Sequence, residues 1–314
     1  MTAMKMKPQS TVIQPFLALL SLATVMVVGL GIAVVWHSPA EHHALLALCR
    51  LDWDEVLAHA PAWRVLVPIT ALAAILVGGL HATFAQLLAS YRFQRALRLL
   101  TVPTPPGVTR VARAHALTVP VQALAWDEPL AFCLGLRRPR IYVSTGLVNL
   151  LDDDELAAVL LHKQHHGQQR DPLVVLLSRA VGAALRFVPV AAHLVDRISL
   201  TQEVAADRYV LHVQGDGGPL ASALLKLARH GRHTTWATVP LSPLNPTRER
   251  LLRLLDGAAP PRRLGWRRSL ASVAVVVALF GISYSSVLPA PQQAVLHTEC
   301  PATSVPHLPP HADH

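Results

Sequence analysis

The sequence predicts a mainly α-helical protein that crosses a membrane several times and carries one folded α+β unit outside it. Hydrophobic residues make up 52% of its 314 residues and charged residues only 15%, whereas a soluble globular domain is about 25% charged. A membrane-spanning helix needs about 20 consecutive apolar residues. Three uncharged stretches meet this requirement: Pro15–Trp36, Val65–Ser90 and Ser269–Leu288.

The first stretch could also be a secretory signal peptide, because Lys5 and Lys7 precede it. Its apolar run is longer than the roughly 7 to 15 residues of a signal-peptide core, and no convincing cleavage pattern of small residues follows. We therefore interpret it as a retained membrane anchor.

A fourth apolar segment, Pro172–Asp196, is ambiguous. It contains Arg179 and Arg186, which lie seven residues apart and so would share one face of a helix. This pattern leaves open a re-entrant pair of helices or a single helix on the membrane surface.

Basic residues are distributed unevenly, since 24 of the 28 lysines and arginines lie between Arg92 and Arg268. By the positive-inside rule, this region faces the cytoplasm of a bacterial-type inner membrane. A nucleic-acid partner is not predicted, because the arginines are spread out and form no binding-module pattern.

The expected parts are an N-terminal segment with the first span (1–36), an outer loop (37–64), a second span (65–90), a cytoplasmic unit (91–268) that includes 172–196, a last span (269–288) and an outer tail (289–314).

The cytoplasmic unit should begin after a linker, Thr101–Gly107, whose three prolines disfavour helix. Val119–Trp126 is β-prone, and two further short runs read as a hairpin: Ala131–Leu134 and Arg140–Val143. Asp152 and Glu155 have the spacing of a capping box. Apolar residues follow at helical spacing, so we expect a helix over Asp153–Gln169.

This helix would carry His162 and His166, four residues apart and hence on one face, as two zinc-binding histidines require. Such a pair can also arise by chance in a chain with 17 histidines. Glu203, in a second helical run, could supply a third ligand, and Asp207 could hydrogen-bond a ligand histidine. His165 offers an alternative pairing with His162 at three residues' separation, although an exposed histidine is the simpler interpretation.

Four ordered segments resemble the BlaR/MecR-type membrane zinc metallopeptidases: Ala131–Val143, Leu151–His162, Arg170–Leu173 and Glu203–Asp207. The resemblance implies a zincin-like (gluzincin-like) fold with cytoplasmic zinc held at His162, His166 and Glu203. It also implies that a substrate peptide adds as an extra strand to the hairpin strand around Phe132. A cytoplasmic protein substrate such as a transcriptional repressor is expected on the same basis.

Lys163 departs from that family, which has a catalytic glutamate after the first histidine. The general base expected there contributes about 10² to 10⁴ in rate. A lysine ammonium about 5 Å from the metal would oppose metal binding by on the order of 3 kcal/mol at an effective dielectric constant of about 20. Glu155 lies two helical turns away and Asp171 further still along the sequence, so neither is an evident substitute. A neutral lysine, or His165, is the remaining way to supply a base.

The short tail also departs from the beta-lactam sensors of that family, because Pro289–His314 holds no penicillin-binding domain. We expect a membrane zinc metallopeptidase homologue with impaired or absent hydrolysis. The alternatives are a pseudopeptidase that acts as a binding or regulatory module, a protease of the HtpX-like membrane family, and a transporter, for which His81 within a span is the only hint. Cys49, Cys133 and Cys300 show no metal-ligand spacing, although Cys49 and Cys300 could form a disulfide on the outer side.

Overall fold

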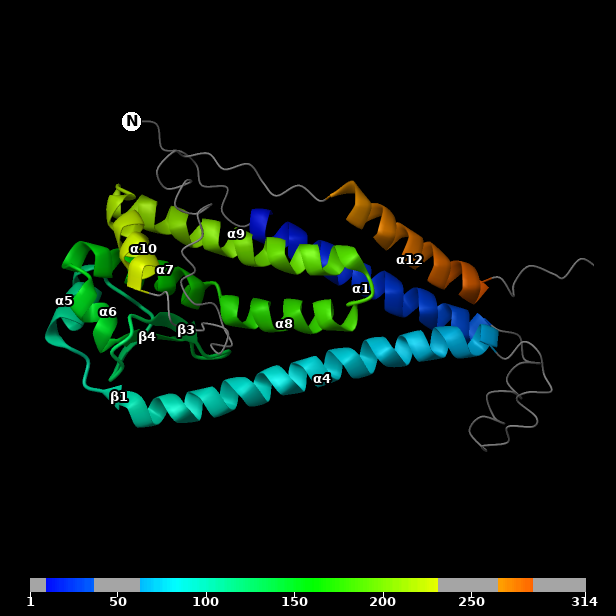
Figure 1. Ribbon diagram of the computed structural model, residues 1–314, viewed down its shortest axis with the longest axis horizontal. Coiled ribbons are helices and arrows are strands. Elements are labelled where there is room, and N and C mark those ends of the chain that lie inside the picture. The colour runs from blue at the N-terminus through cyan, green and yellow to red at the C-terminus, as the bar shows by residue number, and fades with distance from the viewer. Residues whose placement is uncertain (1–9, 37–62, 231–264, 285–314) are drawn as a thin grey trace, which may run out of the picture.

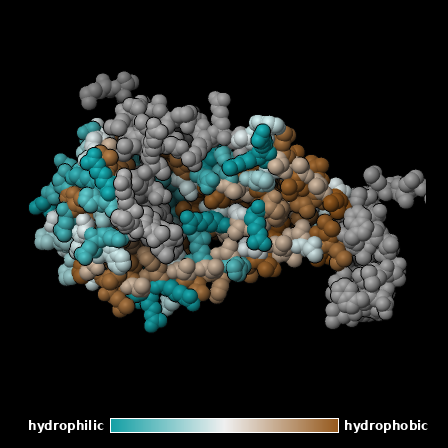
Figure 2. All heavy atoms as spheres, in the orientation of Figure 1, coloured by the Kyte–Doolittle hydropathy of each residue, from teal (hydrophilic) through white to brown (hydrophobic). Residues whose placement is uncertain are grey.

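The computed structural model describes residues 10–36, 63–230 and 265–284. Long helices occupy one end of the molecule, and a small sheet with short helices occupies the other (Figure 1). The surface follows this division, since brown apolar side chains dominate the helical end and teal hydrophilic side chains dominate the sheet end (Figure 2). The mainly α class expected from the sequence is thus confirmed.

Among the described residues, three helices are long and apolar enough to cross a membrane, which agrees with the predicted spans. They are α1 (Ser10–Trp36), α4 (Trp63–Leu100) and α12 (Trp266–Tyr284). The predicted second span ended at Ser90, but α4 continues to Leu100 without interruption. Its last turns therefore reach the folded unit and join the membrane part to the sheet.

The ambiguous apolar segment folds as two helices, α8 (Asp171–Ala184) and the first part of α9 (Pro189–Gln214). Leu185, Ala191 and Ile198 share one apolar cluster with residues of α1 and α4. Helix α8 approaches α4 closely at Gly79, where an added Cβ would lie 3.3 Å from the Cβ of Ala184. Small residues allow such close contact between membrane helices.

Arg179 and Arg186 do not share one helical face, contrary to the sequence-based prediction. Arg179 lies on α8, whereas Arg186 lies in the turn that joins α8 to α9. The chain turns there because α9 begins at Pro189, whose fixed φ suits the first position of a helix.

In the described part of the chain the sheet has four strands in the order β1-β2-β4-β3: β1 (Thr101–Val102), β2 (Val121–Leu124), β3 (Ala131–Leu134) and β4 (Arg140–Ser144). Strands β3 and β4 form the predicted antiparallel hairpin, and β2 pairs with β4 in parallel. Alternate side chains face opposite sides. Phe132 packs against Phe93 of α4, whereas Ala131 belongs to the core on the other side of the sheet.

That second core lies among α5 (Pro106–Ala114), α6 (Thr145–Leu150), α7 (Asp153–Gln168) and α10 (Gly218–His230). Helix α7 occupies its centre, since every residue from Glu155 to Gln164 is buried. The proline-rich linker is less irregular than predicted. Thr101 and Val102 form β1, and Pro106 is the first residue of α5, where a missing N–H does not interrupt helical hydrogen bonding.

Several sequence-based predictions lie outside the described residues. These are the outer loop except its last two residues, the C-terminal tail, Cys49 and Cys300.

Candidate metal centre

Helix α7 holds both candidate histidine ligands at one buried position of the fold. The predicted capping box is present: Asp152 Oδ1 accepts from the Glu155 amide at 2.8 Å, and Glu155 Oε2 accepts from the Asp152 amide at 3.0 Å. The helix then places His162 and His166 one turn apart, with 0% and 2% of their surfaces exposed. Their Nε2 atoms lie 3.0 Å from one another.

Helix α9 brings the candidate carboxylate ligand to this pair. Glu203 Oε2 lies 3.4 Å from His162 Nε2, and Glu203 Oε1 lies 3.5 Å from His166 Nε2. One ligand atom from each of the three residues can be chosen so that all lie within 4.8 Å of one another. The structure thus brings together the His-His-Glu set that the sequence suggested.

A carboxylate lies behind each histidine, on the ring nitrogen that faces away from the set. Asp207 Oδ1 lies 3.0 Å from His162 Nδ1, and Asp171 Oδ2 lies 2.6 Å from His166 Nδ1. A neutral imidazole that donates its Nδ1 proton to a carboxylate has an unprotonated Nε2. Both Nε2 lone pairs therefore point toward the same space as the Glu203 carboxylate.

This donor set fits a metal ion. Lone pairs that converge on one point repel each other unless a proton or a metal cation lies between them. Zinc–ligand bonds of 2.0 to 2.2 Å at tetrahedral angles would separate the ligand atoms by about 3.3 to 3.5 Å. The observed separations of 3.0, 3.4 and 3.5 Å among His162, His166 and Glu203 are close to that value.

Asp171 lies next to a candidate ligand histidine, a position that its distance along the sequence does not suggest. The chain folds back after α7: Arg170 has a left-handed backbone with φ of 54°, and α8 begins at Asp171. This reversal returns the Asp171 carboxylate to His166. Gln202, which the sequence does not suggest either, donates from Nε2 to Asp171 Oδ1 at 2.9 Å. The Arg170–Leu173 segment was the sequence signal that could have pointed to this pair.

Lys163 follows the first histidine and is completely buried, with 0% of its surface exposed. Its charge acts on two neighbouring groups, where it favours the thiolate of Cys133 and disfavours protonation of His166. Burial is the larger effect at both residues: it lowers the pKa of His166 and raises that of Cys133 to about 12. A buried lysine side chain therefore lies beside the first candidate ligand, at the position for which the resemblance implied a carboxylate.

Neither Glu155, which the sequence already makes a poor substitute base, nor His165, which it leaves open, lies in the ligand set. Glu155 is held by the capping box and also accepts from Ser222 Oγ at 2.6 Å and from Lys226 Nζ at 2.6 Å. His165 packs against the ring of Tyr209, with 5.3 Å between ring centroids, and burial lowers its pKa to about 4.

Strand β3 lies at the edge of the sheet beside α7, because its only pairing within the described ranges is with β4. The edge position agrees with the expectation for the hairpin strand around Phe132.

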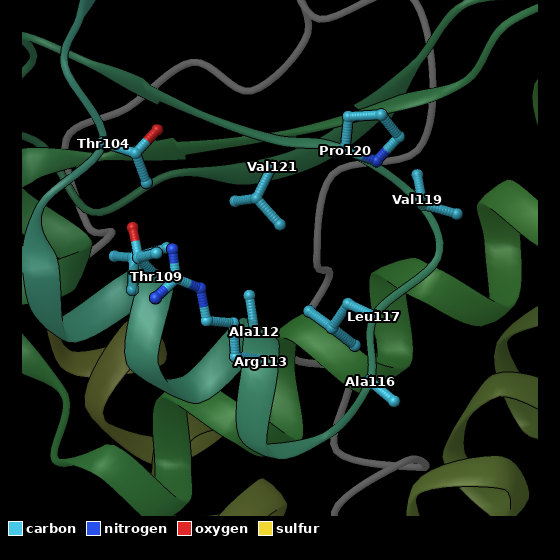
Figure 3. A pocket seen from close by; sticks show the side chains of 10 residues that line it. Thr104, Thr109, Ala112, Arg113, Ala116, Leu117, Val119, Pro120 and Val121 are labelled. Atoms are coloured by element: carbon cyan, nitrogen blue, oxygen red, sulfur yellow. The ribbon is translucent and has the colours of Figure 1, made fainter.

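A separate cavity of about 440 Å³ lies between α5 and the start of β2 (Figure 3). Thr104, Arg113 and Val121 are among its lining residues, and none of the candidate ligands lines it.

Comparison with known proteins gives similar curated relatives named "Protease HtpX homolog". The relative from Salinibacter ruber is 31% identical over 155 residues, which cover 40% of this chain and 56% of the relative. The relative from Acidiphilium cryptum is 28% identical over 218 residues, which cover 56% of this chain and 76% of the relative. A third, from Methanopyrus kandleri, is 38% identical over 72 residues, which cover 23% of each chain.

A family model described as BlaR1 peptidase M56 matches residues 59–254. The match includes α7, α8 and α9, and with them every residue of the candidate metal centre. Since it extends over more than half of the sequence, this chain belongs to the BlaR1 peptidase M56 family.

Proposed function

We propose that this protein is a membrane-embedded zinc metallopeptidase homologue in which His162, His166 and Glu203 hold one zinc ion. The observation that supports this most directly is the convergence of two Nε2 atoms and one carboxylate, with a second carboxylate behind each imidazole. A bound zinc ion would act as a Lewis acid toward a peptide carbonyl and toward water.

Asp207 and Asp171 would position the ligands rather than bind the metal. Asp171 would accept the Nδ1 proton of His166, and the Asp207 carboxylate lies 3.0 Å from His162 Nδ1, so both carboxylates favour the tautomer whose Nε2 can coordinate. Gln202 in turn fixes the orientation of the Asp171 carboxylate. These contacts join α7, α8 and α9, so the site depends on the packing of all three helices.

Lys163 makes hydrolysis poor or absent in this chain. Attack of water on a peptide carbonyl requires a group that accepts a proton, and a protonated lysine cannot do so. Its charge also opposes a metal ion in the same buried site. The second candidate function is therefore a pseudopeptidase that binds a peptide or a regulatory partner without cleaving it.

A matched pair of variants tests this proposal. Lys163→Glu restores the carboxylate, and Arg208→Glu makes the same charge change at an exposed position next to Asp207. In the detergent-purified full chain we expect Lys163→Glu to raise peptide cleavage by about 10² to 10⁴ and to tighten zinc binding. Arg208→Glu should leave both unchanged. Equal cleavage and zinc content with lysine or glutamate at position 163 would refute the role given to Lys163.

We further propose that the site faces the cytoplasm of a bacterial-type inner membrane, where a protein such as a transcriptional repressor could add a strand to β3. The concentration of basic residues between Arg92 and Arg268 supports this orientation. Reporter fusions test it: alkaline phosphatase should be active when fused at His314 and inactive when fused after His230. The reverse result would contradict the orientation while leaving the metal centre untested.

One metal centre requires its ligands on α7 and α9 to lie on the same side of the membrane. The helix hairpin formed by α8 and the first part of α9 connects them. We propose that this hairpin enters the bilayer beside α1 and α4 and returns to the same side. Labelling of single cysteines introduced at the exposed positions 168 and 208 checks the proposal. Accessibility from opposite sides of the membrane would exclude it.

A further inference from the structure

Arginines are concentrated, and carboxylates scarce, where α4 meets the sheet. Between Trp63 and Leu151 the chain has nine arginines, six of them in the last turns of α4 or in the β3–β4 hairpin, together with no lysine and two carboxylates. Those carboxylates, Asp127 and Glu128, lie in the connection that precedes β3, whereas the turn of the β3–β4 hairpin lies at the other end of that strand. The region around the hairpin turn and the end of α4 is therefore strongly positive.

A cavity of about 480 Å³ lies in this region, on the face of the sheet that packs against α4. Arg98 contributes from α4, Arg138 from the hairpin turn and Arg140 from β4. The other lining residues are mostly polar or small: Gln94, Thr101, Gln122, Leu134, Gly135 and Tyr142. Among the residues that the structure describes, the walls of the cavity therefore include three arginines and no acidic side chain.

No acid among the described residues neutralises the three arginines. Within residues 63–230, no ion pair involves Arg98, Arg138 or Arg140. Arg140 Nη1 makes one long contact, 3.4 Å to Gln122 Oε1. Each guanidinium has five N–H donors in a planar arrangement that matches phosphate oxygens, so the cavity has many donors available for an anion.

The end of α4 also places this cavity just beyond the membrane core. A membrane core of about 30 Å accommodates about 20 helical residues, whereas the apolar helix Leu66–Leu100 has 35. Tyr91 is 64% exposed at the end of the uncharged stretch, a position typical of aromatic residues at a membrane surface. Gln94 and Arg98 follow one and two turns later, at the depth of lipid headgroups.

We propose that this cavity, between the end of α4 and the β3–β4 hairpin, binds the phosphate group of an anionic ligand. The ligand would be either the headgroup of an anionic phospholipid or a free phosphate compound. Three arginines that line one cavity provide the charge, the planar N–H donors of each provide the geometry, and the position of the cavity at the end of α4 makes a lipid headgroup accessible. This site is separate from the His162–His166–Glu203 centre.

Binding measurements on the detergent-purified full chain test the proposal in two arms. One arm titrates a fluorescent phosphatidylglycerol in mixed micelles, and the other measures inorganic pyrophosphate by equilibrium dialysis. The double variant Arg98→Gln, Arg140→Gln removes two guanidiniums from the cavity. The control Arg113→Gln, Arg137→Gln removes the same charge from exposed arginines outside it.

We expect the cavity variant to bind about tenfold more weakly for each arginine removed, with the control near wild type. Loss confined to the phosphatidylglycerol arm would assign the site to a lipid headgroup, and loss confined to the pyrophosphate arm to a free phosphate compound. The proposal is overturned if neither probe binds, or if the control loses as much affinity as the cavity variant. A thermal unfolding curve for each variant separates lost binding from lost folding.

Discussion

Substitution of Asp171 by Asn tests the metal centre through a residue that touches one ligand and binds no metal itself. The carboxylate is 5% exposed, lies 2.6 Å from His166 Nδ1 and accepts from Gln202 Nε2 at 2.9 Å. Asparagine has almost the same shape but no charge. Its amide group would also face the Gln202 amide donor unless one of the two side chains rotates.

The expected loss follows from these two contacts. A hydrogen bond to a charged group contributes about 1.5 to 3 kcal/mol and one between neutral groups about 0.5 to 1.5 kcal/mol. Removing the charge behind His166 should therefore weaken the hydrogen bond that orients the His166 ring by about 1 to 2 kcal/mol. Loss of such a supporting group typically weakens metal binding about 10- to 100-fold. We expect Asp171→Asn to weaken zinc binding by that factor.

Competition of the purified full chain with a chromogenic zinc chelator measures the change. Asp154→Asn is the matched control, because Asp154 is exposed at the start of α7, far along the helix from His166. Unchanged zinc affinity in Asp171→Asn would refute the positioning role of Asp171. An equal loss in both variants would show that the effect is not specific to the site.

Three further predictions concern the framework around the site. The pKa of Glu155 is lowered, because hydrogen bonds from Lys226, Ser222 and the Asp152 amide outweigh the raising effect of burial. The stabilisation that the ionised Glu155 gives to the folded state should be complete above its ordinary pKa of 4.5 and be lost as the pH falls below that value. Glu155→Gln should remove this pH dependence of the free energy of unfolding, as measured by urea unfolding. Gly146→Ala should destabilise the fold by about 1 to 3 kcal/mol or more in thermal unfolding, because its Cβ would collide with the backbone carbonyl of Asp127. Cys133, whose pKa burial raises to about 12, should resist maleimide at pH ~8 until the protein unfolds, since only about one thiol in 10⁴ is then ionised.

Each of these predictions has its own control. Lys226→Met should reduce the pH dependence of stability in the same direction as Glu155→Gln, and an unaltered profile in both would contradict the ion pair. Gly107→Ala, where an added Cβ meets nothing within 4 Å, should be tolerated. The thiol measurement requires Cys49→Ser and Cys300→Ser, and rapid labelling of the folded protein would mean that Cys133 is accessible.

Local sequence patterns were sufficient for the elements that depend on neighbouring residues. The three spans follow from uninterrupted apolar length. The start of α7 follows from Asp152 and Glu155, whose side chains cap the helix through contacts three residues apart. Because residues four apart lie one turn apart on a helix, the sequence also predicted that His162 and His166 would face one point.

The tertiary structure decided what depends on chain reversals and on packing between distant segments. The left-handed turn at Arg170 brings Asp171 back to His166, although the sequence places it on the next helix. Antiparallel packing of α8 and α9 carries Glu203 to α7. Likewise, the cavity with Arg98 and Arg140 exists because α4 continues past the membrane and packs on the sheet. Such contacts depend on which side chains the whole fold buries together, so spacing along the chain does not reveal them.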